Sequence, residues 1–361
     1  AIALAIIPPV LSGGGWAQWI YRALTFLVVS CPCALVVSVP LTFFGGIGGA
    51  SRKGILIKGG NYMDALAKTG TIVFDKTGTL TKGVFAVEAV HPDKIGEKEL
   101  LHLAAHVEQY STHPIAAALR NAYENENDSC TVESAKEIAG NGIEALVNGK
   151  KVSVGNEKLM TSLGITVKEC PRCKGHAGTV VHVAIDGVYA GHVVVADKVK
   201  DDSASAISQL KALGADRTVM LTGDRENVAE NVAKKLGIEE YHAELLPTDK
   251  VDRVESLLKE KRKDKTLAFV GDGINDAPVL ALADVGIAMG ALGSDAAIEA
   301  ADVVLMDDKP SKIATAIRIA RRTIRIAREN AWFAIAVKVA ILILAATGLL
   351  GSLAMALAVF G

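Results

Sequence analysis

The chain has 361 residues, with 39 lysines and arginines against 40 aspartates and glutamates, so its formal net charge is −1. That balance excludes a typical nucleic-acid binder, which needs a strongly basic face. Hydrophobic residues make up 50% of the chain and the mean hydropathy is +0.31, which excludes a disordered protein. Because charged residues still make up 22%, we expect apolar segments set apart from a soluble part of two or three domains. The odd number of cysteines, 5, argues against a secreted disulfide framework.

Two apolar segments lie at the ends of the chain. Residues 23–51 carry no charged side chain, and this run is longer than the roughly 20 residues that a membrane-spanning helix needs. We therefore expect a transmembrane helix over residues 16–50, preceded at residues 1–11 by the end of another. Residues 331–361 carry a single charge, at Lys338, and predict a further transmembrane helix and the start of one more. Both ends look cut, so we expect a chain truncated at both ends.

Basic residues flank the middle of the chain on both sides. One cluster follows the first apolar segment, and the other lies in a predicted basic stalk helix over residues 311–330. The positive-inside rule then places the middle of the chain in the cytoplasm. The second cluster would also fit a solvated face of an amphipathic helix, and the two explanations are compatible. The clusters consist of Arg52, Lys53, Lys58 and Lys68, and of Lys312, Arg318, Arg321, Arg322, Arg325 and Arg328.

The middle of the chain alternates between strand patterns and helix patterns. Asp75, Thr222 and Asp272 each lie just past a short apolar run, and helical patterns such as 203–213 and 227–236 lie between them. Strands that alternate with helices imply a parallel sheet, whose site lies at the carboxyl ends of the strands. We therefore expect Asp75, Thr222 and Asp272 to converge.

Residues 86–195 have a different character. They contain alternating runs typical of strands, such as 151–154 and 180–185, together with two helical patterns. This stretch predicts an inserted α+β domain. It would interrupt a first domain made of residues 51–85, which include a stalk, and residues 196–310.

The segment Asp75–Thr81 is the sharpest chemical motif. An aspartate at a strand end, on a glycine-containing loop of backbone N–H donors, can attack a phosphoryl group covalently. The alternative is an ordinary turn between a strand and a helix. Two further segments, Thr222–Asp224 and Asp272–Pro278, occur at suitable distances along the chain and favour the chemical interpretation.

Together with Lys250, these motifs resemble those of the heavy-metal-transporting P-type ATPases, in the haloacid dehalogenase superfamily. The resemblance covers nearly the whole chain. It implies a Rossmann-like parallel-sheet phosphorylation domain, ATP as substrate, Mg²⁺ as cofactor, and an aspartyl-phosphate at Asp75. It also implies a multi-pass protein of the cell membrane, in contact with lipid, with its catalytic domains in the cytoplasm.

The resemblance assigns roles to the motif residues. The implied Mg²⁺ ligands are the carboxylates of Asp75 and Asp272 and the carbonyl of Thr77, all hard oxygen donors. Thr222 and Lys250 would hold the transferring phosphoryl oxygens. Two further residues would support this shell, namely Asn275 and Asp276.

One departure concerns Thr77. Related phosphatases place a second aspartate there as acid and base, so we expect the aspartyl-phosphate to persist until another group activates water. In the family this group is a Thr-Gly-Glu loop on an actuator domain, and no such tripeptide occurs in this chain. We expect the actuator domain and further membrane helices to lie outside the chain, which alone would not complete transport.

The inserted domain resembles the nucleotide-binding domain of the same class. The residues that carry this resemblance are Glu108, His113, Gly140, Gly142 and Asn156. His113 could stack on the adenine or hydrogen-bond to it, and the glycines allow close backbone approach. On its own, His113 would more often be a residue at a helix start.

Cys31 and Cys33 flank a proline in the first apolar segment. Thiolates select soft metals, and a proline leaves a backbone carbonyl available for an ion. This pair is also the family's transport signature. Lys338 resembles the pattern of members that export zinc, cadmium or lead, in which the next helix carries an aspartate. Snorkelling of Lys338 to the headgroups is the alternative.

A second cysteine motif, Cys170–Cys173 followed by His176, offers three candidate metal ligands in a polar loop. An incidental reduced pair is the competing interpretation, and Cys130 looks incidental too. We therefore expect an ATP-driven exporter of Zn²⁺, Cd²⁺ or Pb²⁺. The alternatives are a copper-transporting P-type ATPase, a membrane-tethered phosphatase, or a non-catalytic metal-binding module.

Overall fold

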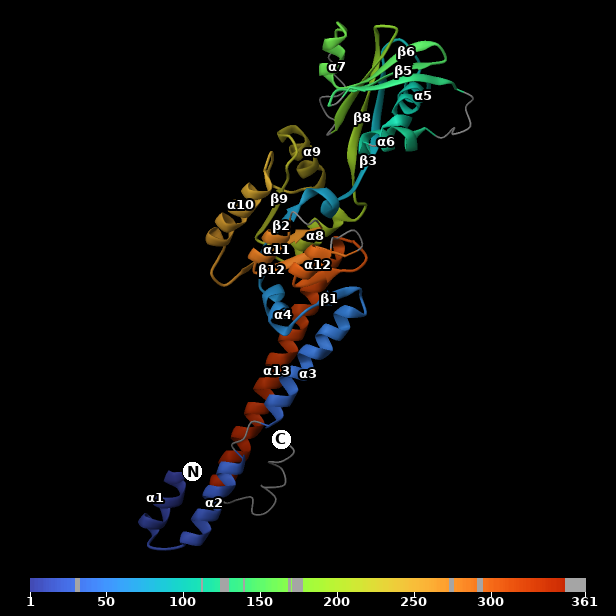
Figure 1. The fold of residues 1–361 in the computed structure, drawn as a ribbon. Helices are drawn as coiled ribbons and strands as arrows, with labels where there is room; N and C mark the ends of the chain where they lie inside the picture. Colours follow the sequence, from blue (N-terminus) through green and yellow to red (C-terminus); the bar gives the residue numbers. More distant parts are fainter. Residues whose placement is uncertain are drawn as a thin grey trace. The chain divides into compact units, whose positions relative to one another are not determined.

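The computed structural model describes residues 1–29, 33–111, 113–123, 130–138, 140–167, 170, 178–272, 276–290 and 295–347 (Figure 1). These residues fall into two units. The first holds Ala1–Lys68 and the chain from Thr315 onward, and the second holds Thr69–Ala314.

The first unit is helical. Its helices are α1 (Ile2–Ser12), α2 (Trp16–Val29), α3 (Cys33–Ser51), α4 (Gly60–Ala67) and the part of α13 (Ser311–Thr347) beyond Ala314, and it contains the short strand β1 (Ile55–Ile57). Helices α3 and α13 pack closely, because a Cβ atom at Gly46 would overlap the Thr323 side chain. The Asn330 amide also donates to Thr42 Oγ1 at 3.3 Å.

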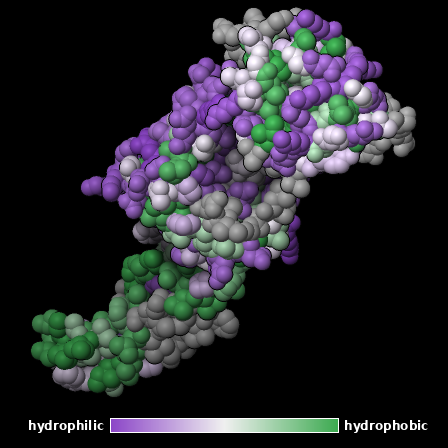
Figure 2. Space-filling model, turned by 45° about the horizontal axis from the view of Figure 1, so that its top comes forward, coloured by the Kyte–Doolittle hydropathy of each residue, from purple (hydrophilic) through white to green (hydrophobic). Residues whose placement is uncertain are grey.

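Large apolar side chains are exposed over this helical unit, where Figure 2 shows an almost continuous hydrophobic surface. They come from all the longer helices and include Ile2, Leu11, Leu24, Leu27, Val36, Phe44, Trp332 and Phe333. Within the described part of the chain, no helix combines the length and the apolarity needed to cross a membrane.

The second unit contains a parallel sheet in the order β13-β12-β11-β2-β9-β10. Its strands are β2 (Thr69–Asp75), β9 (Arg217–Leu221), β10 (Glu240–His242), β11 (Thr266–Gly271), β12 (Val285–Met289) and β13 (Val303–Leu305). Every residue of β2 is buried. Such burial is typical of a central strand of a parallel sheet, which is covered on both faces. The predicted parallel sheet is confirmed.

Helices connect the strands of the parallel sheet. They are α8 (Ser203–Ala212), α9 (Glu226–Leu236), α10 (Pro247–Glu260), α11 (Ala277–Leu282) and α12 (Asp295–Ala300). Alternate residues of the central strands, such as Val73 and Phe269, pack against apolar side chains of α10, α11 and α12. The sheet therefore has a continuous core beneath the strand ends that carry the predicted site.

A second sheet of six strands, antiparallel throughout, lies between β2 and β9 in the chain, in the order β3-β8-β7-β6-β5-β4. The strands are β3 (Thr81–Pro92), β4 (Val132–Ile138), β5 (Gly142–Val147), β6 (Lys150–Gly155), β7 (Thr179–Ile185) and β8 (Val188–Val199). Helices α5 (Glu97–Val107) and α6 (Pro114–Ala122) pack on one face, and α7 (Glu157–Ser162) packs on the other. The predicted inserted α+β fold is confirmed.

Candidate active site

The site begins where three neighbouring parallel strands end. Asp75 is the last residue of β2, Thr222 follows β9, and Asp272 follows β11. Because β2 lies between β11 and β9, and Asp75 is in register with Leu221, the three polar residues reach the same edge of the sheet. Parallel strands place their functional residues at this edge. The structure thus brings the three residues together as expected.

The turn after Asp75, residues Lys76–Leu80, has an irregular backbone. Thr77 has φ −73° and ψ 132°, and Gly78 has a positive φ of 72°. A Cβ atom at Gly78 would overlap the Asp272 carboxylate. Both the left-handed backbone and the close approach therefore require glycine. The Thr77 side chain is exposed in this turn.

Carboxylates crowd around Asp75. One oxygen each from Asp75, Asp272 and Asp276 lies within 4.8 Å of the others. The Lys250 ammonium on α10 bridges two of them, with Nζ 2.6 Å from Asp75 Oδ1 and 3.0 Å from Asp276 Oδ1. Asp75 and Asp276 are both nearly fully buried. This arrangement concentrates negative charge at the strand ends, with Lys250 as the direct counter-charge.

Burial and mutual repulsion change the acidity of these groups. Burial, followed by the charge of Asp276, raises the pKa of Asp75 to about 7, although Lys250 opposes the shift. Burial and Asp276 likewise raise the pKa of Asp272 to about 6. The pKa of Lys250 is raised: burial lowers it, but Asp75 and Asp276 outweigh burial. Lys250 therefore remains an ammonium at neutral pH.

The donor set fits Mg²⁺. Hard oxygen ligands, one or two of them carboxylates, are what Mg²⁺ takes from proteins. The three clustered carboxylates of Asp75, Asp272 and Asp276 provide them. The third predicted ligand, the Thr77 carbonyl, belongs to the same turn. Asn275, predicted to support this shell, lies outside the described residues.

Ion pairs of Lys76 and a hydrogen bond from Lys200 hold the turn in place, and the sequence did not predict them. Lys76 pairs with Asp224, and its Nζ lies 3.7 Å from Asp197 Oδ2. Lys200 Nζ donates to the Gly78 carbonyl at 2.6 Å. Asp197 and Lys200 come from the end of β8 and just after it, more than 100 residues along the chain from the turn. No local pattern signals such distant partners.

The predicted nucleotide residues share a cavity of about 240 Å³ beside the six-stranded sheet. Glu108, His113, Gly140, Gly142 and Asn156 all line it. His113 begins α6, and its Nδ1 accepts a hydrogen bond from the Ile115 amide at 3.2 Å. His113 therefore caps the start of α6, and it also lines the cavity.

A glycine and an asparagine side chain shape this cavity. A Cβ atom at Gly142, which has a φ of 145°, would overlap the Val154 carbonyl and the Gly155 backbone. Asn156 donates to the Gly140 carbonyl at 2.9 Å and accepts from the Leu159 amide at 3.1 Å. At position 142, the space between β5 and β6 is therefore too small for any side chain larger than that of glycine.

Glu108 is the buried acid of the cavity. Its side chain is nearly inaccessible, and burial raises its pKa to about 7, although Arg120 opposes the shift. The Arg120 guanidinium donates to the backbone carbonyls of Glu108 and Ser111, at 2.5 and 2.9 Å. Glu108 is therefore partly protonated near neutral pH and can donate as well as accept a hydrogen bond.

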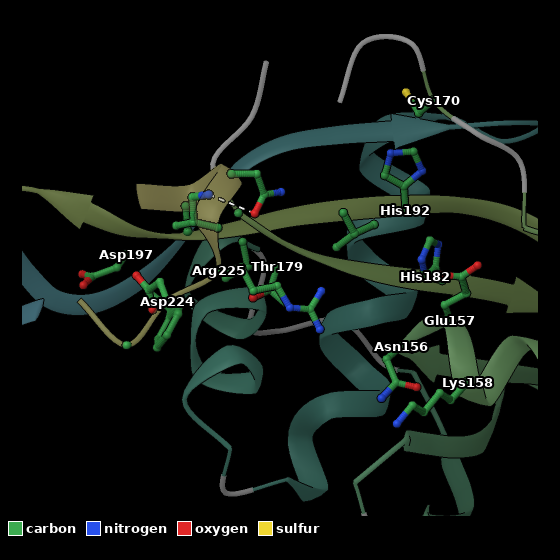
Figure 3. Close-up of a pocket in the computed structure, with 18 of the residues that line it drawn as sticks. Asn156, Glu157, Lys158, Cys170, Thr179, His182, His192, Asp197, Asp224 and Arg225 are labelled. Carbon is green, nitrogen blue, oxygen red and sulfur yellow. Dashed lines mark hydrogen bonds between the residues drawn. The ribbon is translucent and has the colours of Figure 1, made fainter. Parts of the chain in front are cut away.

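A larger cavity, about 940 Å³, adjoins the first one through Asn156, which lines both. Its other walls include Lys76 and Thr77 from the turn after β2. Asp224 and Arg225, which follow β9, line it too (Figure 3). An elongated ligand could therefore extend from the Glu108 cavity toward the turn after Asp75.

Two histidines of the antiparallel sheet, His182 and His192, also line the larger cavity. Burial, with a contribution from His91 and His182, lowers the pKa of His192 to about 4, so this ring is neutral at physiological pH. Burial also lowers the pKa of His182.

Known proteins resemble this chain over most of its length. A family model described as haloacid dehalogenase-like hydrolase matches residues 69–284. The "Cadmium, zinc and cobalt-transporting ATPase" of Bacillus subtilis is 55% identical over 97% of the chain and 49% of its own length. The crystal structure of a zinc-transporting PIB-type ATPase in the E2.Pi state superposes with a TM-score of 0.88 at 40% identity, over 99% of this chain and 58% of that one. The catalytic domain of the CPx-ATPase CopB-B matches at 30% identity and a TM-score of 0.58, over 75% of this chain and 98% of that domain. The chain belongs to the haloacid dehalogenase-like hydrolases, as a P-type ATPase of the heavy-metal class.

This P-type ATPase chain spans about half the length of the curated relatives it matches. Of its predicted cargo residues, Cys31 lies outside the described residues, and Cys33 is the first residue of α3. Lys338 lies half-buried on α13. The grouping of these three residues at one cargo site therefore stays a prediction.

The second cysteine motif is only partly described in this P-type ATPase chain. Cys173 and His176 lie outside the described residues, whereas Cys170 is described. Cys130, which the sequence suggested was incidental, lies with its sulfur 3.2 Å from His102 Nε2.

Proposed function

We propose that this chain forms the phosphoryl-transfer part of an ATP-driven pump that exports a soft divalent cation, Zn²⁺, Cd²⁺ or Pb²⁺. In the proposed reaction, an Asp75 carboxylate oxygen attacks the γ-phosphorus of ATP. An acyl-phosphate bond forms at Asp75, the bond to the β-phosphate oxygen breaks, and ADP leaves. The observation that carries this proposal is the contact between Asp75, at the end of β2, and the Lys250 ammonium.

The residues around Asp75 support the step. The carboxylate must be ionised to attack, and Lys250 stabilises that form at 2.6 Å while opposing the effect of burial. The same ammonium can neutralise the charge that develops on the transferring phosphoryl oxygens. The Thr222 hydroxyl, just beyond the neighbouring strand end, is proposed to bind one of these oxygens.

Mg²⁺ is the implied cofactor, and Asp75 and Asp272 would hold it together with the Thr77 carbonyl. When bound, it would supply positive charge that reduces the repulsion between the carboxylates and the phosphate. Asp276 already shares Lys250 with Asp75, and we assign it a supporting role. Gly78 contributes by leaving space for Asp272.

The aspartyl-phosphate is proposed to be long-lived in this chain. A threonine, Thr77, stands two residues after the nucleophile, and its hydroxyl is a poor general base at neutral pH. Hydrolysis therefore needs another group to activate water, and a separate domain of the whole protein would provide it.

The Glu108 cavity is proposed to bind the adenine of ATP. Its volume of about 240 Å³ suits a nucleobase rather than a whole nucleotide, and it adjoins the larger cavity toward Asp75. Glu108 and His113 provide polar groups at its wall. The triphosphate would then extend toward Lys76 and Thr77.

The cargo is proposed from the thiol chemistry and from the relatives. Thiolates at Cys31 and Cys33 would bind a soft cation, and Lys338 would neutralise the emptied site. The Bacillus subtilis relative is named for cadmium, zinc and cobalt, and a similar solved structure is named for zinc. The exposed apolar surface of α1, α2, α3 and α13 supports a location in the cell membrane, with lipid as a partner (Figure 2).

Phosphorylation by γ-labelled ATP with Mg²⁺ tests the catalytic proposal. We expect acid-stable, hydroxylamine-sensitive label on the chain and none on Asp75→Asn. Label that persists in Asp75→Asn, or that resists hydroxylamine, would refute an aspartyl-phosphate at this residue. The cargo proposal is tested separately by equilibrium binding of Zn²⁺ and Cd²⁺ before and after Cys31→Ser/Cys33→Ser. An unchanged stoichiometry would refute it.

A further inference from the structure

A second group of metal-ligating side chains lies in the six-stranded sheet. His91 on β3 and His192 on β8 are directly opposite each other in the antiparallel register, with ring centroids 5.1 Å apart. Cys170 comes from the chain between α7 and β7, and its thiol lies beside the His192 ring (Figure 3). One ligand atom from each of the three residues lies within 4.8 Å of the others.

The donor chemistry of this group selects a particular class of ion. Two imidazoles and a thiol suit borderline divalent metals, and disfavour Mg²⁺ and Ca²⁺, which take oxygen ligands. In a tetrahedral zinc site, with bonds of about 2.0–2.3 Å, ligand atoms are about 3.5 Å apart. The three ligand atoms lie within 4.8 Å of one another, so a pair at that limit would have to approach by about 1.3 Å. Rotation of the Cys170 side chain can supply much of this change, because Cys170 lies outside the strands.

The surroundings orient one of the ligands. Tyr189 Oη lies 3.1 Å from His192 Nδ1 and 3.0 Å from His182 Nδ1, so the three side chains form a buried hydrogen-bonded chain. Metal-ligating histidines usually have the second ring nitrogen held in this way, which fixes the tautomer and the ring orientation. With Nδ1 engaged by Tyr189, His192 would bind a metal through Nε2. Tyr189 and His182 thus hold the ligand His192 in a fixed orientation.

We propose that His91, Cys170 and His192 form a binding site for a borderline divalent cation, Zn²⁺, Cd²⁺ or Co²⁺, in the antiparallel-sheet domain. The cation would be held by two imidazole nitrogens and the Cys170 thiolate, whose proton is released on binding. Water or another ligand completes the coordination. This site is separate from the cargo thiols Cys31 and Cys33. Its existence does not depend on the proposed transport function.

In another cluster, His102, His106 and Cys130, the ligand atoms also lie within 4.8 Å of one another, but this cluster is a weaker candidate. There the sulfur already interacts with two neighbours, lying 3.1 Å from Asn148 Nδ2 and 3.2 Å from His102 Nε2. A metal would have to displace these contacts. This second cluster therefore serves as the matched comparison.

The proposed metal site lies on a strand that also contacts the turn after Asp75. Strand β8 carries His192 and, five residues further on, Asp197, which pairs with Lys76 next to the nucleophile. A cation bound at His192 would tie the Cys170 segment to this strand. The same strand would then connect an occupied metal site with the turn that follows Asp75.

Co²⁺ titration of the full chain tests the site. The experiment uses a Cys31→Ser/Cys33→Ser background, so that the cargo thiols contribute no signal. We expect a thiolate-to-Co²⁺ charge-transfer absorption that disappears with Cys170→Ser and remains with Cys130→Ser. His91→Gln and His192→Gln should each weaken Co²⁺ binding at least tenfold.

Thermal unfolding provides a second readout that needs no activity. Zn²⁺ is expected to raise the Tm of the background protein and of Cys130→Ser, but not that of Cys170→Ser, because a ligand that binds only the folded state stabilises it. Without metal, Cys170→Ser should unfold at the same temperature as the background, which shows that the fold is intact. The proposal is overturned if the absorption is absent from the background, persists in Cys170→Ser, or is lost with Cys130→Ser.

Discussion

Lys250 Nζ lies 2.6 Å from the nucleophile candidate Asp75 and 3.0 Å from Asp276, so one ammonium serves two buried carboxylates. The sequence separates Asp75 from Lys250 by 175 positions. Their contact results from the adjacency of β2 and β9 and from the start of α10 near the same sheet edge.

Lys250→Met is expected to reduce the rate of Asp75 phosphorylation by about 100-fold or more, the usual effect of removing one group that stabilises transition-state charge. The affinity for nucleotide should change little, because the Glu108 cavity does not include Lys250. Rapid-quench phosphorylation and equilibrium nucleotide binding would measure the two effects. Lys259→Met, at an exposed position of the same helix, is the control. Equal rates in the two variants would contradict the role of Lys250.

Gly78→Ala is expected to abolish phosphorylation, because the new Cβ atom would overlap Asp272. Gly164→Ala is the matched comparison, since Gly164 has the same φ of 72° but nothing within 4 Å of its added Cβ. The shared backbone strain costs about 1–2 kcal/mol. Denaturant unfolding should show that loss for Gly164→Ala and a larger one for Gly78→Ala. If both variants lose the same stability and keep phosphorylation, Gly78 is not needed for close packing.

Glu108→Gln is expected to change how stability depends on pH. The folded-state pKa of Glu108, about 7, lies above its ordinary value of 4.5, so its contribution to stability is full below pH 4.5 and is lost as pH rises through 7. The variant should match the parent at pH 4.5 and exceed it at pH 8, by up to about 3 kcal/mol. Urea unfolding at several pH values would measure the difference. An equal gain at both pH values would show that ionisation of Glu108 is not the cause.

Lys76→Met is expected to destabilise the second unit by about 3–5 kcal/mol, because it leaves the buried Asp197 carboxylate without its cation. The exposed pair between Lys68 and Asp64 offers the contrast. Lys68→Met should cost less than about 1 kcal/mol. Comparable losses in the two variants, measured by denaturant unfolding, would mean that the Lys76 pair is no stronger than a surface one.

The sequence by itself determined the class of fold and most candidate residues. A continuous apolar run ending at Asp75 predicts a buried parallel strand with a functional group at its end, and alternating runs predict an antiparallel insertion. These signals are local, because the alternation of apolar and polar residues along a strand, and the polar residue at its end, can be recognised within a short stretch of sequence. Glu108, His113 and Asn156 were also selected from the sequence, and the structure places them around one cavity. Their roles remain proposals.

Only the tertiary structure decided which distant residues support these groups. Asp197 and Lys200 hold the turn after Asp75 from the far end of the inserted domain, and Lys250 is shared with Asp276. His91 lies directly opposite His192, and it became a candidate metal ligand only when the sheet register placed both residues beside Cys170. Ion pairs and metal ligands depend on distances of a few ångströms between side chains. Such distances arise from strand order and register, which no local pattern in the sequence encodes.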